Sequence, residues 1–266
     1  MPSILTLEKI MLRKSSLIVA LILSMLVLSS CNLPSRQAAQ SATPTSITVI
    51  LPEISPTPVR LCDNQYFPND TGNTWEYSGS NTAIGAYDRK DIVTSSSNTA
   101  FTLETTLSTV TYPVNYDCSS AGLAAADPIQ QYVGALLNSP DAPVNVELTS
   151  ISGISLPAKI VPGDAWQQTA DWEASSQDFN LKGRFAFNYT AVGYESVTVP
   201  FGTFNALRVD ATIRIEVSGF RILAGTYTTT TWMVPEVGIV KSEGTSHVPG
   251  VDFTDGMQLT SYTPAP

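Results

Sequence analysis

Three cysteines and one histidine are the residues of this 266-residue chain whose types could support redox, metal or nucleophilic chemistry. The histidine, His247, lies between Ser246 and Val248 on an expected loop, and the chain has no Gly-x-Ser-x-Gly motif to carry a serine nucleophile. A hydrolase triad needs a base within reach of the nucleophile, so we expect no triad. With one histidine and no Cys-x-x-Cys spacing, we expect no metal site.

Paired carboxylates are the second kind of group to weigh, because two acidic side chains at a suitable separation can hydrolyse a glycosidic bond. Most acidic residues alternate with apolar neighbours, a pattern that places them on the solvated faces of strands. The residues concerned are Glu76, Glu104, Asp164, Glu173, Asp210 and Glu216. Oxygen-rich stretches at 63–64, 69–73 and 252–256 could hold calcium, but none has the ligand spacing of an EF-hand. We therefore expect no metal, no cofactor and no enzymatic activity.

Cys31 closes a segment typical of a bacterial lipoprotein signal peptide. Arg13 and Lys14 form a positive leader, residues 17–28 are apolar with one serine among them, and two further serines precede the cysteine. The apolar run is shorter than the roughly 20 residues that a spanning helix needs. We expect residues 1–31 to be the signal peptide, with Cys31 as the lipidated mature N-terminus that carries acyl chains such as palmitate.

Residues 32–61 are rich in Ser, Thr, Pro, Ala and Gln, and such a segment cannot bury enough apolar area to offset the entropy of ordering. We expect a disordered tether that holds a single β domain, residues 62–263, off the lipid surface. After Cys31 no other stretch is long and apolar enough to cross a bilayer. The expected location of the domain is therefore extracytoplasmic, anchored to the cell membrane or the outer membrane.

The charge of the chain limits its partners. Beyond the leader it carries 11 basic and 22 acidic residues, a net charge of -11. Such a surface repels polyanions, so we expect no nucleic-acid partner. The expected partners are the membrane, through the lipid anchor, and an apolar ligand or an envelope protein.

Cys62 and Cys118 are the two remaining cysteines. In an oxidising compartment two remaining thiols most often pair, and the bridge would contribute about 4 kcal/mol on the chain-entropy model. We predict this disulfide, with two free thiols or a metal site as the alternative.

Period-two alternation of apolar and polar residues runs through most of the domain. Every second residue from Leu207 to Val217 is apolar, and residues 179–189 alternate in a similar way. Weaker strand patterns occur at 74–78, 87–94, 100–110, 111–117, 144–151, 165–173, 194–199, 225–233, 238–243 and 251–262. Short joints with Gly, Asn or Pro separate most of them, which predicts a sequential antiparallel meander with one dry and one wet face.

The segment from Asp127 to Asn138 has helical periodicity instead. Pro128 is typical of a helix start, and the following apolar residues, among them Leu136, fall on one face. We therefore predict a mainly β fold: a large curved antiparallel meander sheet, or half-open barrel, with one short helix covering its concave face. A two-sheet sandwich is the alternative. The helix either fills the concavity as core, which we favour, or forms a lid over a cavity.

Four short motifs mark turns that precede strands. They are GNTWEY at 72–77, GDAW at 163–166, VPFGTF at 199–204 and WMVPEVG at 232–238. Together they resemble the turns of the TapB-like family and of related bacterial envelope lipoproteins with domains of unknown function. The resemblance implies an antiparallel sheet whose strands open at these turns, and it implies no settled activity. Phe201 departs from the family's Val-Pro-x-Gly-Thr-Phe turn, where a small residue is expected.

Trp75, Trp166, Trp172 and Trp232 are the candidate ligand-facing aromatic residues. They could form a platform for a carbohydrate, or they could open strands and pack into the core, which is the interpretation we favour. The function predicted from the sequence is that of a membrane-anchored extracytoplasmic lipoprotein, non-catalytic, with a binding or structural role in the cell envelope. The alternative is an envelope glycan hydrolase with its carboxylates on the wet face of the sheet.

Overall fold

The computed structural model describes residues 60–126, 145–175, 180–218, 223–248 and 251–266. The regular elements of these residues are all strands. None of these residues forms a helix long and apolar enough to cross a membrane. The predicted helix from Asp127 to Asn138 lies outside the described residues, as do Cys31 and nearly all of the tether. The strands are β1 (Thr74–Asn81), β2 (Gly85–Ser96), β3 (Ala100–Leu107), β4 (Val110–Ser119), β5 (Gly122–Ala125), β6 (Asn145–Gly153), β7 (Leu156–Pro157), β8 (Ala165–Ser175), β9 (Asn180–Val199), β10 (Gly202–Ser218), β11 (Leu223–Val234), β12 (Gly238–Val248) and β13 (Val251–Thr263).

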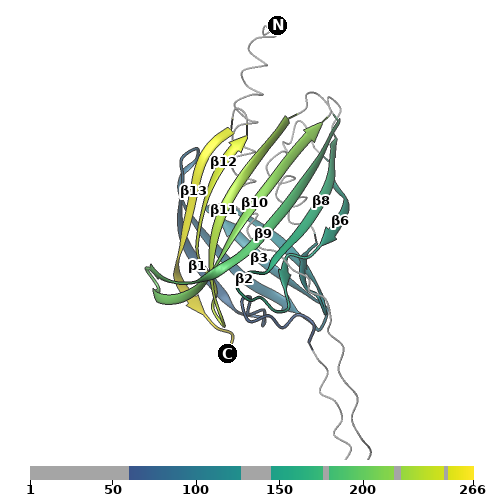
Figure 1. The fold of residues 1–266 in the computed structure, drawn as a ribbon. Helices are drawn as coiled ribbons and strands as arrows, with labels where there is room; N and C mark the ends of the chain where they lie inside the picture. Colours follow the sequence, from purple (N-terminus) through teal and green to yellow (C-terminus); the bar gives the residue numbers. More distant parts are fainter. Residues whose placement is uncertain (1–59, 127–144, 176–179, 219–222, 249–250) are drawn as a thin grey trace, which may run out of the picture.

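These strands form one sheet, in the order β6-β8-β9-β10-β11-β12-β13-β1-β2-β3-β4-β5-β7. The chain enters this sheet in its middle, because β1 pairs antiparallel with β2 on one side and with β13 on the other. Figure 1 shows the sheet curling into a barrel, with β8–β11 in front of β1–β3. The prediction of one large antiparallel sheet that does not close is confirmed, and the alternative of a two-sheet sandwich is wrong.

The two edges of the sheet meet at one end of the barrel. β6 and β7 lie at opposite edges although only two residues separate them. The Ile154 amide donates to the Gln167 carbonyl of β8 at 3.4 Å, and the Ser155 amide donates to the Leu123 carbonyl of β5 at 2.5 Å. This two-residue link therefore holds β5 beside β8, without a continuous ladder between the edge strands.

Alternation along β10 separates an inner from an outer face. Val209, Ala211, Ile213 and Ile215 are buried, whereas the residues between them are at least partly exposed. The buried residues of all the long strands form one apolar cluster, whose removal from water is the main favourable contribution to folding.

Two strand glycines are explained by rings that lie over them. The Tyr87 ring covers Gly79, its partner across β1 and β2, and the Trp172 ring covers Gly183, its partner across β8 and β9. A Cβ at either glycine would overlap the ring. Glycine at these positions thus creates space for a large cross-strand aromatic residue.

The predicted strands at 179–189 and 194–199 are one continuous strand, β9. Between the two patterns a register shift against β10 inserts an extra residue, Val192, and both Val192 and Tyr194 are exposed. Beyond this bulge the β9–β10 hairpin projects from the barrel, at the left of Figure 1. Its tip is held to β13 by a hydrogen bond from the Phe201 amide to the Leu259 carbonyl at 3.1 Å.

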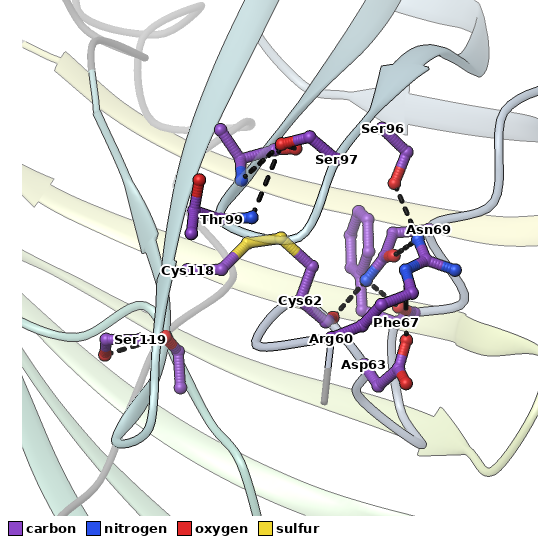
Figure 2. Close-up of a disulfide and its surroundings, with 12 residues drawn as sticks. Arg60, Cys62, Asp63, Phe67, Asn69, Ser96, Ser97, Thr99, Cys118 and Ser119 are labelled. Atoms are coloured by element: carbon purple, nitrogen blue, oxygen red, sulfur yellow. Dashed lines mark hydrogen bonds and ion pairs between the residues drawn. A yellow bond between two sulfur atoms is a disulfide. The ribbon is translucent and has the colours of Figure 1, made fainter. Parts of the chain in front are cut away.

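The segment before β1, residues 60–73, is fastened to the sheet by a disulfide. Cys62 pairs with Cys118 of β4, with their Cα atoms 4.9 Å apart (Figure 2). Both half-cystines are buried. The predicted Cys62–Cys118 disulfide is confirmed, and it joins parts of the chain that are 56 residues apart.

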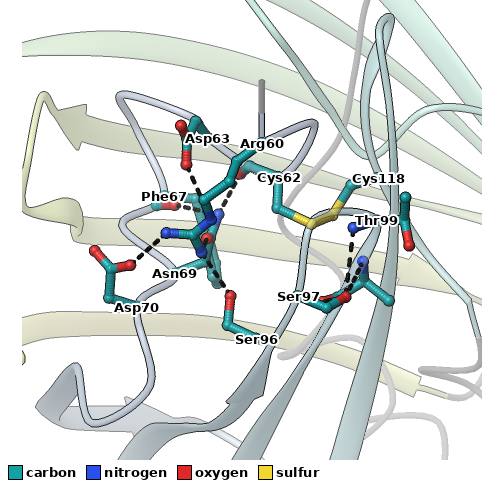
Figure 3. A network of polar contacts seen from close by, with 11 residues as sticks. Arg60, Cys62, Asp63, Phe67, Asn69, Asp70, Ser96, Ser97, Thr99 and Cys118 are labelled. Atoms are coloured by element: carbon teal, nitrogen blue, oxygen red, sulfur yellow. Dashed lines mark hydrogen bonds and ion pairs between the residues drawn. A yellow bond between two sulfur atoms is a disulfide. The ribbon is translucent and has the colours of Figure 1, made fainter. Parts of the chain in front are cut away.

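Arg60 holds the same segment from its solvent side. Its guanidinium donates to Asp70 at 2.6 Å, to Asn69 Oδ1 at 3.1 Å and to Ser96 Oγ at 2.8 Å (Figure 3). Asp63 lies 3.5 Å from Arg60 Nε. In the stretches considered as calcium ligands, oxygen atoms of Asp63, Asn69 and Asp70 are therefore engaged by a guanidinium.

Candidate functional site

A buried ion pair lies on the inner face of β2. Arg89 Nε donates to both carboxylate oxygens of Asp91 at 3.0 and 3.1 Å, and the two side chains are 13 % and 7 % exposed. Thr105 Oγ1 adds a hydrogen bond to Asp91 at 2.8 Å, and the guanidinium lies 5.9 Å from the ring centre of Tyr77. Burial opposes the charge of Arg89, but the adjacent carboxylate outweighs it and raises the Arg89 pKa above its ordinary value.

Asp255 of β13 is a second buried carboxylate. Its oxygens accept hydrogen bonds from the Tyr87 hydroxyl at 3.1 and 3.2 Å and from Asn81 Nδ2 at 3.2 Å. Burial raises the Asp255 pKa to about 6, although these donors and the charge of Arg89 work in the opposite direction. Its direct partners are neutral, so the charge of Asp255 is less well compensated than that of Asp91.

We call this group the polar cluster; it comprises Asn81, Tyr87, Arg89, Asp91, Thr105 and Asp255. Buried tyrosines with raised pKa values lie near its charged groups: Tyr77, Tyr87, Tyr112, Tyr116 and Tyr227. Burial is the main cause of each shift, so these hydroxyls stay protonated at neutral pH and can donate hydrogen bonds.

The inner face of β8 and β9 carries a continuous stack of aromatic rings. We call it the aromatic row; it comprises Trp166, Trp172, Phe185, Phe187 and Tyr189, with neighbouring ring centres 5.6 to 6.3 Å apart. The indole nitrogens of Trp166 and Trp172 are buried and have no hydrogen-bond partner among the residues that the structure describes. An unpaired buried donor is uncommon in a native interior and calls for an acceptor. The row lies across the barrel from β1–β3 (Figure 1).

The four tryptophans singled out in the sequence are not brought together. Trp75, Trp166 and Trp172 are buried on the inner face, and the Trp75 indole donates to the Val237 carbonyl at 2.6 Å. Trp232 lies on the outer face of β11, where it is 8 % exposed beneath Lys241.

The carboxylates predicted on wet faces are all at least partly exposed. Asp210 is bound by Arg208 at 2.8 Å, and Glu243, its neighbour two strands away, is bound by Lys241 at 2.7 Å. A general acid for glycoside cleavage needs an environment that keeps it protonated, such as a buried, apolar one. Neither of these exposed, ion-paired groups has such an environment.

His247 lies at an exposed position in β12, so its expected place on a loop is wrong. Within the described residues no three His, Cys, Asp or Glu side chains are grouped so as to hold a metal ion.

The sequence reasoning missed the polar cluster. One signal was available for Asp255, which stands in the apolar phase of β13 between Phe253 and Met257. No such signal marks Arg89 and Asp91, because charged residues occur in both phases of β2.

A family model described as DUF3108-like matches residues 136–247, which include β6 to nearly the end of β12. Among solved structures, a Bacteroides fragilis protein provisionally called exported, with a YmcC-like fold, is 14% identical; the match covers 76% of this chain and 100% of that one, with a TM-score of 0.50. A provisionally assigned lipoprotein of Parabacteroides distasonis is 15% identical over 76% of this chain and 99% of its own, with a TM-score of 0.48. The hypothetical lipoprotein YmcC of Escherichia coli is 12% identical over 76% of this chain and 87% of its own, with a TM-score of 0.33.

No curated protein is significantly similar to this chain in sequence. The first of the solved structures supports a shared fold alone. The predicted resemblance to proteins with domains of unknown function is confirmed in this coarser form, whereas membership of the TapB-like family stays a prediction.

Proposed function

We propose that the protein is a lipid-anchored envelope protein that binds an amphiphilic molecule inside its barrel and does no chemistry on it. The signal sequence that ends at Cys31 supports the anchor, and a tether of about 30 residues would let the barrel move freely above the membrane.

The observation that carries the binding role is the pair of unpartnered indole N–H groups in the aromatic row. Trp166 and Trp172 lie on the same inner face of β8, with Gln168 and Ala170 between them on that face. The stacked rings around them would receive an apolar chain, and the two donors would each receive an oxygen acceptor. A molecule with acyl chains and ester or amide carbonyls has both features, so a lipid is the ligand class we propose.

The polar cluster would form a wall of this site and would have no catalytic role. Asp91 is held by Arg89, and Asp255 accepts hydrogen bonds from Asn81 and Tyr87. The rigid, satisfied hydrogen bonds of the cluster suit a wall that positions a ligand.

Native mass spectrometry of the full chain, extracted from membranes in mild detergent, tests the proposal. We expect a retained lipid that contains carbonyl groups. The double substitution Trp166→Phe and Trp172→Phe keeps an aromatic ring at each position but removes both donors, and should lower lipid retention about tenfold. Trp75→Phe is the matched control, since its N–H is already satisfied, and should retain lipid as the unmodified protein does. An extracted protein that carries no lipid and takes up no fluorescent phospholipid would contradict the proposal.

Fractionation tests the anchor separately. Cys31→Ser removes the thiol that the diacylglyceryl group would occupy, so the variant should leave the membrane fraction. A variant that still pellets with membranes after a high-salt wash would show that another element holds the protein there.

A further inference from the structure

The outer face of the sheet carries a groove. It is a hollow of about 970 Å³ that crosses β9 to β13 and continues over the β1–β2 hairpin. We call this hollow the outer groove.

Two parallel rows of side chains form the walls of the groove. In one row Thr212, Thr228, Thr245 and Thr254 are consecutive cross-strand partners on β10 to β13. The other row lies two residues away on each strand, so it points to the same side. Its members are Thr190, Asp210, Thr230, Glu243 and Gly256.

The threonine row offers free hydrogen-bonding groups at regular intervals. Within the described residues none of its four hydroxyls has a hydrogen-bond partner. Neighbouring strands lie about 4.8 Å apart, so donors and acceptors repeat along the groove at that interval. A repeating array of this kind suits a ligand that is itself a repeating series of polar units.

The charges of the groove decide between classes of polar polymer. Its lining includes the outward-facing carboxylates of Asp210 and Glu243, the buried Asp255 of the polar cluster, and no lysine or arginine of the described residues. The bases that neutralise the outward-facing carboxylates, Arg208 and Lys241, lie in the next row, outside the lining. An acidic lining on a strongly acidic protein disfavours an anionic polymer.

The groove also lacks what an apolar partner would need. The apolar side chains of its lining are those of Ala86 and Ala211. Trp232, on the outer face of β11, is covered by Lys241, whose Nζ lies 4.7 Å from the ring centre. Hydroxyl, amide and carboxylate groups are therefore what the groove presents to a ligand.

We propose that the outer groove binds an uncharged oligosaccharide that lies across the strands and is held by hydrogen bonds to the threonine row. The sugar hydroxyls would donate to and accept from the threonine hydroxyls, and the carboxylates would accept from further sugar hydroxyls. This site lies on the opposite face of the sheet from the proposed lipid site and does not depend on it.

Isothermal titration of the full chain in detergent tests the proposal, with chitohexaose and maltohexaose as neutral probes and a heparin hexasaccharide as the anionic probe. We expect at least one neutral hexasaccharide to bind and the heparin hexasaccharide not to bind. The double substitution Thr212→Val and Thr228→Val removes two hydroxyls but keeps the shape and the β-branching, and should weaken binding about tenfold or more.

The matched control is Thr198→Val with Thr203→Val. These two residues are an exposed cross-strand threonine pair of the same sheet, outside the groove, and should leave the affinity unchanged. Three outcomes would overturn the proposal: neither neutral sugar binds, the heparin hexasaccharide binds more tightly than both, or the groove variant and the control variant bind alike. A circular-dichroism melt of each variant confirms that it is folded, and none of these outcomes bears on lipid retention.

Discussion

The polar cluster and the aromatic row are built alike and differ in how their polar groups are satisfied. Both occupy the inner face of long antiparallel strands, and both surround polar atoms with aromatic rings. In the polar cluster Asp91 and Asp255 each accept several hydrogen bonds, whereas in the aromatic row two indole donors have no acceptor. Buried polar groups that have their hydrogen bonds make a rigid wall. Buried donors without an acceptor mark the place where a ligand could supply one.

The largest effect should come from breaking the ion pair of the polar cluster. Asp91→Ala would leave the Arg89 charge buried without its partner, and should cost about 3 to 5 kcal/mol of unfolding free energy. Urea denaturation followed by tryptophan fluorescence measures this loss. The double substitution Arg89→Met with Asp91→Leu removes both charges and should cost less than Asp91→Ala alone. A double variant less stable than the single one would show that the pair is worth more than an apolar replacement.

The disulfide that fastens the segment before β1 should have the next effect. Replacing Cys62 and Cys118 by alanine frees the segment before β1 and should lower the unfolding free energy by about 2 to 4 kcal/mol, chiefly through the greater entropy of the unfolded chain. The melting temperature should fall while the far-ultraviolet circular dichroism stays that of a β protein. Alkylation of the unmodified protein without reductant provides the control, because both cysteines should stay unlabelled.

Asp255 should make stability depend on pH. Its pKa is about 6 in the folded protein and near 3.8 when unfolded, so the folded state binds more protons between these values. The stabilising contribution is fully present below pH 4 and is lost as the pH rises through 6. Relative to Asp255→Asn, the unmodified protein should therefore lose on the order of 2 to 3 kcal/mol between pH 4 and pH 7. Parallel denaturation curves at both pH values measure this difference, and a constant difference would refute the assignment.

The smallest expected effect is the difference in unfolding free energy between two tryptophan substitutions. Trp75→Phe deletes an indole that donates to the Val237 carbonyl, whereas Trp172→Phe deletes one that has no partner. Both substitutions remove a similar area of buried ring, so Trp75→Phe should be more destabilising by about 1 kcal/mol, the value of one hydrogen bond. Equal losses measured on lipid-free protein would mean that the Trp172 indole does find an acceptor.

Short strands and a bulge account for what the strand predictions missed. β5 and β7 have four and two residues, too few to display an alternation. β9 contains a bulge at Val192, where the exposed apolar side chains of Val192 and Tyr194 interrupt the alternation, so its two halves resemble separate strands.

The sequence by itself determined the period-two alternation of most strands, and it favoured one antiparallel sheet and the pairing of Cys62 with Cys118, because alternation is a local property and two remaining thiols in one domain have one way to pair. Only the tertiary structure decided that β1 pairs with β13, that the edges of the sheet meet through Ile154 and Ser155, and that Arg89, Asp91 and Asp255 face inward. Alternation shows which residues share a face of a strand. Which face encloses the core, and which distant strands become neighbours, depends on contacts between residues far apart in the chain, and no local pattern records them.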